Sequence, residues 1–173
     1  MFSAAENAED LYENGCRDIG AQEVAAGDVV VGISAAGNAA YVVGALDEAK
    51  ARGCVTVGLS CNADTAVLRA ADIPIVTDTG AEILTGSTRL KAGTAQKIVL
   101  NTISTCAMVK TGRVVENLMI NLSPSNHKLK KRVISIVCDL LACDEVRAVA
   151  LLEANEWSIR RALAADGKNG QTV

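Results

Sequence analysis

Small hydroxyl residues and two cations gather at residues 86–97, where a turn passes into a long segment of helical periodicity. Ser87 and Thr88 offer hydroxyl donors, and Arg89 and Lys91 add positive charge. Backbone N–H groups at the start of a helix attract phosphate, and a guanidinium can bind two oxygens at once. These four residues are therefore predicted to bind an anionic group of a substrate. The alternative is an ordinary helix cap with solvated cations beside it.

The helix behind this turn is predicted from about Leu90 to about Lys110, because apolar side chains recur there at helical spacing. One face of the helix would be buried, and the N–H groups of its first turn would point outward, free to bind a ligand. The apolar positions are Leu90, Ala95, Ile98, Val99, Ile103, Cys106 and Val109.

Carboxylates near the beginning of the chain are a second candidate for chemistry. Glu6 and Glu9 are three residues apart, so on a helix their side chains would share one face. A carboxylate crowded by a like charge can serve as a general base. The alternative is a solvated helix start, because the helix dipole alone favours acidic residues in first turns.

Strand-like and helix-like segments alternate between residues 28 and 77, which predicts an α/β fold with a parallel sheet and right-handed crossovers. Ligands of such sheets bind beyond the carboxyl ends of the strands. Ser34, Ser60 and the turn before Leu90 are therefore expected to face one crevice. The predicted strands are residues 28–34, 54–60 and 73–77, and the predicted helices between them are residues 38–52 and 65–71.

A glycine-containing turn, residues 32–38, joins the first predicted strand to its helix. Ser34, Gly37 and Asn38 lie in this turn. Backbone donors at such a place can hold a phosphate or sugar hydroxyls, so these three residues are predicted to contact a substrate. The alternative is an ordinary tight turn between a strand and a helix.

Composition favours a compact globular protein and argues against several function classes. Half of the residues are apolar, aromatic residues make up 2%, and the formal net charge is −3. The absence of a long apolar run and of a secretion signal predicts a cytoplasmic protein with no membrane partner. The acidic balance and the scarcity of aromatic residues argue against a nucleic-acid partner.

The six cysteines are scattered without a Cys-x-x-Cys pair, and the chain has one histidine. Metal sites need clustered ligands, so no metal and no cofactor is expected. The thiols are predicted to be reduced and mostly buried, packing as small apolar groups. His127 lies in a polar run and is interpreted as a solvated surface residue.

Residues 86–111, together with Asn117, Leu118 and Met119, resemble the N-acetylmuramic acid 6-phosphate etherases. The resemblance extends over residues 5–155. Those enzymes have the sugar isomerase (SIS) fold, and the glucokinase regulatory protein of animals is similar to them. The resemblance implies a three-layer, flavodoxin-like parallel sheet, followed by a small C-terminal helical bundle.

The resemblance also implies a reaction. The family's enzymes are carbon–oxygen lyases that cleave the lactyl ether of N-acetylmuramic acid 6-phosphate, giving N-acetylglucosamine 6-phosphate and D-lactate in cell-wall amino-sugar recycling. They act as homodimers without a cofactor. Residues 5–10 are similar to the family's Val-Glu-Gly-Ala-Glu-Asp segment, whose second glutamate is catalytic; by position this residue is Glu9, and Glu6 is expected to bind substrate.

Two departures from the family pattern keep a second function open. The family has a serine near Ala36, an arginine near Asn38, and threonine and proline near Ala39 and Ala40, and all four are replaced here. Family members also carry earlier strands, a phosphate-binding loop and a second glutamate before the matching region. Without them, residues 28–34 are expected at an exposed sheet edge. The alternative function is a non-catalytic sugar-phosphate-binding or regulatory SIS protein, or a truncated inactive homologue.

Three parts are predicted along the chain. Residues 1–122 would form a partial SIS domain, and residues 123–166 a small helical domain similar to the ubiquitin-associated-like tail of the etherases. Residues 167–173 would form a frayed tail.

Overall fold

The computed structural model describes residues 7–167. The chain divides into two units, Met1–Leu100 and Asn101–Val173, and the division falls within the long helix α4, Lys91–Lys110. The boundary predicted from sequence lies later, after residue 122. The two differ because Ile120 is buried in the core of the C-terminal helices, so the segment before residue 122 packs with them.

Three parallel strands form the sheet of the first unit in the order β1-β2-β3, which confirms the predicted α/β fold. The central strand has five of its six residues buried, which explains its continuous apolar sequence. The first strand lies at one edge, as expected, and its Val29 is 60% exposed. The strands are β1 Val29–Ile33, β2 Val55–Ser60 and β3 Ile73–Val76.

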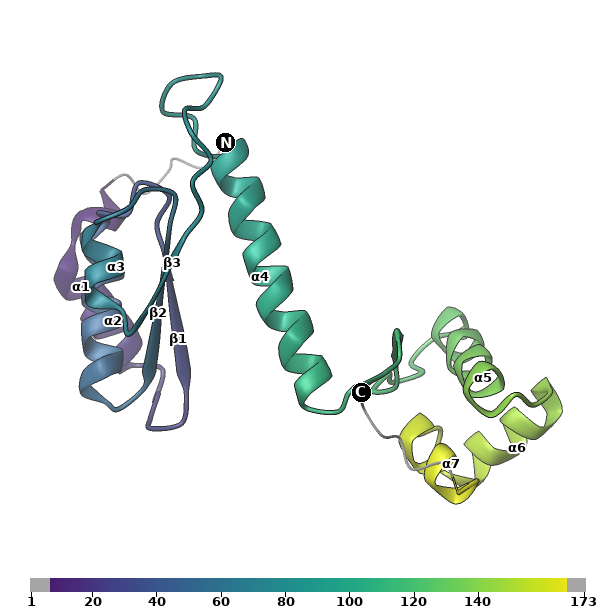
Figure 1. Ribbon diagram of the computed structural model, residues 1–173. Coiled ribbons are helices and arrows are strands. Elements are labelled where there is room, and N and C mark those ends of the chain that lie inside the picture. Colours follow the sequence, from purple (N-terminus) through teal and green to yellow (C-terminus); the bar gives the residue numbers. More distant parts are fainter. Residues whose placement is uncertain (1–6, 168–173) are drawn as a thin grey trace. The chain divides into compact units, whose positions relative to one another are not determined.

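Three helices lie together on one side of this sheet (Figure 1). Two of them were expected from the helical patterns between the strands. Each of these two helices is shorter than predicted by one or two residues at either end. The first helix, by contrast, begins only after the acidic segment around Glu9. The three helices are α1 Tyr12–Gly20, α2 Ala40–Ala51 and α3 Ala66–Ala70.

Glycines permit the close packing of these layers. A Cβ on Gly32 of β1 would lie 2.8 Å from a methyl carbon of Val42 on α2. Within the helical layer, a Cβ on Gly44 of α2 would overlap the backbone oxygen of Tyr12 on α1. Larger residues at these positions would therefore force backbone segments apart.

A cluster of polar side chains joins β2 to β3 at the amino ends of these strands. The Asp72 carboxylate accepts hydrogen bonds from the Thr56 backbone N–H at 3.0 Å and the Thr56 hydroxyl at 2.8 Å, and it pairs with the Lys50 ammonium at 3.0 Å. These contacts, the Thr56 backbone N–H above all, lower the pKa of Asp72 to about 2.

The second unit is a helical bundle with a short hairpin. Each helix of the bundle begins at a side chain that accepts a backbone N–H: Asn126 from Leu129, Asp144 from Arg147, and Ser158 from Arg161. The hairpin lies within residues 114–119. Its strands are β4 Val114–Val115 and β5 Leu118–Met119, and the helices are α5 His127–Leu141, α6 Glu145–Ala154 and α7 Ile159–Ala165.

The cysteine thiols are free, as expected, but the prediction that most are buried is wrong. Cys54 is buried, Cys106 is exposed, and the other four are intermediate. Cys106 lies on α4, whose apolar positions are largely exposed within residues 7–167. In the same part of the chain, no helix combines the length and apolar character needed to cross a bilayer.

We predict that Gly44→Ala destabilises the first unit by about 1–3 kcal/mol, because the added methyl overlaps the α1 backbone. Gly93→Ala is the matched control. It is also a helical glycine, but its Cβ would lie at an ordinary 3.5 Å from the Thr88 oxygen, so the change should stabilise by up to about 1 kcal/mol. Urea unfolding followed by circular dichroism measures both; equal effects would contradict the packing argument.

A second prediction concerns acid stability. Asp72 has a lowered pKa in the folded state, so its contribution to stability is present above pH about 4 and disappears as the pH falls toward 2. Asp72→Asn should therefore lower the unfolding temperature at neutral pH and have progressively less effect on acidification. Asp64→Asn, at an exposed position of the same unit, is the control for the loss of one carboxylate elsewhere on the surface. Equal effects of the two substitutions at neutral pH would contradict the prediction.

Candidate functional site

The carboxyl ends of the three strands converge, as expected for a parallel sheet. The Ser34 N–H donates to the Leu59 oxygen at 3.0 Å, and the Thr77 N–H donates to the Ser60 oxygen at 2.9 Å. Cys61, directly after β2, places its sulfur 3.3 Å from the Thr77 hydroxyl oxygen. This edge is where ligands of open α/β sheets bind.

The polar groups of the turn after β1 bond within the turn and to the start of α3. The Ser34 hydroxyl accepts the Gly37 N–H at 3.0 Å, and the Asn38 side-chain oxygen accepts the Ala66 N–H at 3.2 Å, at the start of α3. Gly37 has φ +84°, and a Cβ there would overlap the hydroxyls of Ser60 and Thr65. Of the three residues predicted to contact substrate here, Ser34 and Gly37 therefore also serve the turn itself, and Asn38 holds the start of α3.

The first N–H groups of α4, which were expected to be free, donate hydrogen bonds to a side chain of the same unit. The helix begins at Lys91, and the Glu82 carboxylate accepts the Lys91 N–H at 3.0 Å and the Ala92 N–H at 2.9 Å. The expectation that these donors are free is wrong because the chain supplies its own anion at the positive end of the helix. The Ala92 N–H, with smaller contributions from Lys91, lowers the pKa of Glu82, which is therefore ionised at neutral pH.

The four residues predicted to bind an anion have distinct positions around this helix start. The Lys91 ammonium donates to the Thr79 backbone oxygen at 2.7 Å. Thr88 is exposed and its backbone oxygen accepts the Gly93 N–H at 2.9 Å. Ser87 is partly buried, and Arg89 is exposed to solvent.

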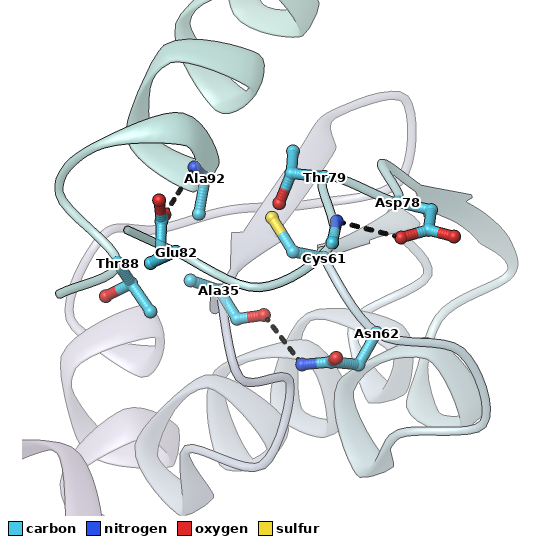
Figure 2. Close-up of a pocket in the computed structure, with 9 residues that line it drawn as sticks. Ala35, Cys61, Asn62, Asp78, Thr79, Glu82, Thr88 and Ala92 are labelled. Carbon is cyan, nitrogen blue, oxygen red and sulfur yellow. Dashed lines mark hydrogen bonds between the residues drawn. The ribbon is translucent and has the colours of Figure 1, made fainter. Parts of the chain in front are cut away.

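A polar pocket of about 110 Å³ lies between the carboxyl edge of the sheet and the start of α4. Figure 2 shows the side chains of Cys61, Thr79 and Glu82 around the same space. The sequence-based candidates contribute Thr88 alone to its wall. The lining residues are Ala35, Cys61, Asn62, Asp78, Thr79, Gly80, Glu82, Thr88 and Ala92.

Most of the polar residues of this pocket were not singled out by sequence reasoning. Asn62 donates to the backbone oxygens of Ala35 and Ala36 at 3.4 Å, and Asp78 accepts the Gly80 N–H at 3.0 Å. Asp78 directly follows one predicted strand and Asn62 lies two residues after another, which is a signal that could have found them. No such signal marks Glu82, which lies nine residues before the helix start that it caps.

The predicted catalytic carboxylate lies outside this pocket. Glu9 is exposed and belongs to a single 3-10 turn, Ala8–Asp10, rather than to a helix. Glu6 lies outside the described residues. Between residues 7 and 167 the structure contains no group of three metal-ligating side chains.

Comparison with known proteins places the chain in a family. The SIS domain model matches residues 2–105. The N-acetylmuramic acid 6-phosphate etherase of Symbiobacterium thermophilum is 46% identical over 165 residues, which cover 95% of this chain and 55% of the relative. The proteins of the same name from Exiguobacterium sp. and Escherichia coli O1:K1 are 44% and 45% identical, over 94% and 96% of this chain and 55% and 56% of theirs.

The chain thus spans about 55% of the length of these curated relatives. The matched domain covers the parallel sheet, the helices packed on it, the polar pocket and the first part of α4. The expected relationship is confirmed by the domain match and by the three relatives together. The chain belongs to the SIS-domain family and is a homologue of the N-acetylmuramic acid 6-phosphate etherases.

Proposed function

We propose that the protein acts as a carbon–oxygen lyase on N-acetylmuramic acid 6-phosphate, releasing D-lactate and N-acetylglucosamine 6-phosphate. The observation that carries this proposal is the 46% identity to an etherase over 95% of the chain. The polar pocket at the carboxyl edge of a parallel sheet supports it, because such edges bind small polar ligands.

The reaction starts from the open-chain sugar, whose C1 carbonyl acidifies the proton on C2. A carboxylate removes that proton, the C3–O bond to lactate breaks, and a double bond forms between C2 and C3. The lactate oxygen takes up a proton as it leaves, and water then adds to C3. We assign the base to Glu9, whose exposed carboxylate in the turn Ala8–Asp10 is accessible to a substrate.

The substrate contacts are proposed in the turn after β1 and around the start of α4. Ser34, Gly37 and Asn38 belong to the turn after β1, and Thr88 lines the pocket. The remaining proposed contacts are Glu6, Ser87, Arg89 and Lys91.

We also propose a cytoplasmic homodimer that takes part in the recycling of cell-wall amino sugars. Ile83 and Leu84, in the loop that forms one wall of the pocket, are 90% and 57% exposed. Adjacent exposed aliphatic side chains of this size favour an interface with another protein surface.

A second function, sugar-phosphate binding without catalysis, is favoured by one specific observation. The Glu9 carboxylate is not among the groups that line the pocket described within residues 7–167. Binding without lactate release would distinguish this function from the lyase.

We predict that Glu9→Gln abolishes exchange of the substrate C2 proton with deuterated water, lowering its rate at least about 100-fold, while leaving sugar-phosphate binding in place. The matched control is Asp10→Asn, one residue along the same turn, which should retain exchange. Mass spectrometry measures C2 deuterium, and an enzymatic assay measures D-lactate.

The same assay separates the two functions. Exchange and lactate together support the lyase, and exchange without lactate supports Glu9 as a base whose partner acid lies elsewhere. Binding with neither signal favours the non-catalytic function. Unchanged exchange in Glu9→Gln removes Glu9 from the mechanism.

A further inference from the structure

The polar pocket has a charge pattern unsuited to a phosphate. Two carboxylates, Asp78 and Glu82, line it, and its other polar side chains are the amide of Asn62 and the hydroxyls of Thr79 and Thr88, with the Cys61 thiol. A phosphate dianion placed among them would be repelled by both carboxylates. The charge of the pocket therefore argues for a neutral ligand.

The N-terminus of α4, an anion-binding feature beside the pocket, is already occupied. Both N–H groups that open α4 donate to Glu82, and the Lys91 ammonium is directed to the Thr79 backbone oxygen. A phosphate could bind there only by displacing a carboxylate that is part of the chain and therefore always present at high effective concentration. The carboxylate thus blocks this helix end against free anions.

The same groups are well suited to sugar hydroxyls. Each Glu82 oxygen accepts one N–H and keeps a further lone pair, and Asp78 uses one oxygen to accept the Gly80 N–H. Hydrogen bonds from hydroxyls to carboxylates are short and strong. The pocket volume of about 110 Å³ corresponds to roughly three or four water-sized groups, which is part of a sugar ring with its substituents.

We propose that this pocket binds the neutral, hydroxyl- and amide-bearing part of an amino sugar, with Glu82 and Asp78 as hydroxyl acceptors, and that the phosphate binds outside it. The proposal rests on the proposed function, because that function supplies a phosphorylated amino sugar as the ligand. Glu82 then has two roles: it holds the loop before α4 against the helix, and it selects against anions at this end of the substrate.

The test separates the two halves of the ligand. N-acetylglucosamine, inorganic phosphate and N-acetylglucosamine 6-phosphate are titrated, each at millimolar concentration, into the ¹⁵N-labelled protein, and the backbone amide signals are followed by NMR. The neutral sugar should shift the signals of Asn62, Thr79 and Ala92, and so should the phosphosugar. Inorganic phosphate should leave the Lys91 and Ala92 signals in place.

Variants identify the acceptors. Glu82→Gln should weaken binding of the neutral sugar about 10-fold, the effect of losing a charge-assisted hydrogen bond. Asp78→Asn should do the same while leaving the Glu82 contacts to α4 intact, which separates lost binding from a loosened loop. Glu13→Gln, at an exposed position on α1, is the matched control and should bind as the parent protein does.

The outcomes distinguish this inference from the proposed function. If inorganic phosphate shifts the Lys91 and Ala92 signals of the unsubstituted protein, or the neutral sugar leaves the pocket signals unchanged while the phosphosugar binds, the inference is overturned and the proposed function stands. If neither sugar binds, both are overturned.

Discussion

Hydrogen bonding between the Glu82 carboxylate and the first two backbone N–H groups of α4 is the interaction on which the candidate site depends. It closes the irregular segment between β3 and α4 into a loop, so that residues far apart in sequence line one pocket. The Lys91 side chain ties the other end of the same loop through the Thr79 oxygen. The loop, the helix start and the sheet edge are thereby held in one arrangement.

This arrangement explains why polar residues with the appearance of ligand contacts serve the fold as well. Ser34 closes its own turn, and the Asn38 side chain caps α3. A side chain that caps a helix and one that binds a ligand at a helix start need the same chemistry, an oxygen near free N–H groups or a donor near an anion. The pattern of residue types alone does not separate these roles.

Much of the fold could be predicted from local patterns. The apolar runs located the three parallel strands described within residues 7–167, each to within one residue at its ends. The hairpin around Glu116 has no such local signal, since its turn needs a positive φ that this residue type rarely adopts. The capping by Glu82 could not be predicted, because it depends on how a long loop folds back onto the helix.

Amide hydrogen exchange at Lys91 and Ala92, resolved by NMR, tests most directly whether Glu82 caps α4. The first N–H groups of a helix normally lack a partner within the helix and exchange rapidly. The Glu82 contacts predict slow exchange at both amides, lost in Glu82→Ala and retained in Asp78→Asn. Rapid exchange at both amides in the unsubstituted protein would contradict the account, because the helix end would then be open to a phosphate.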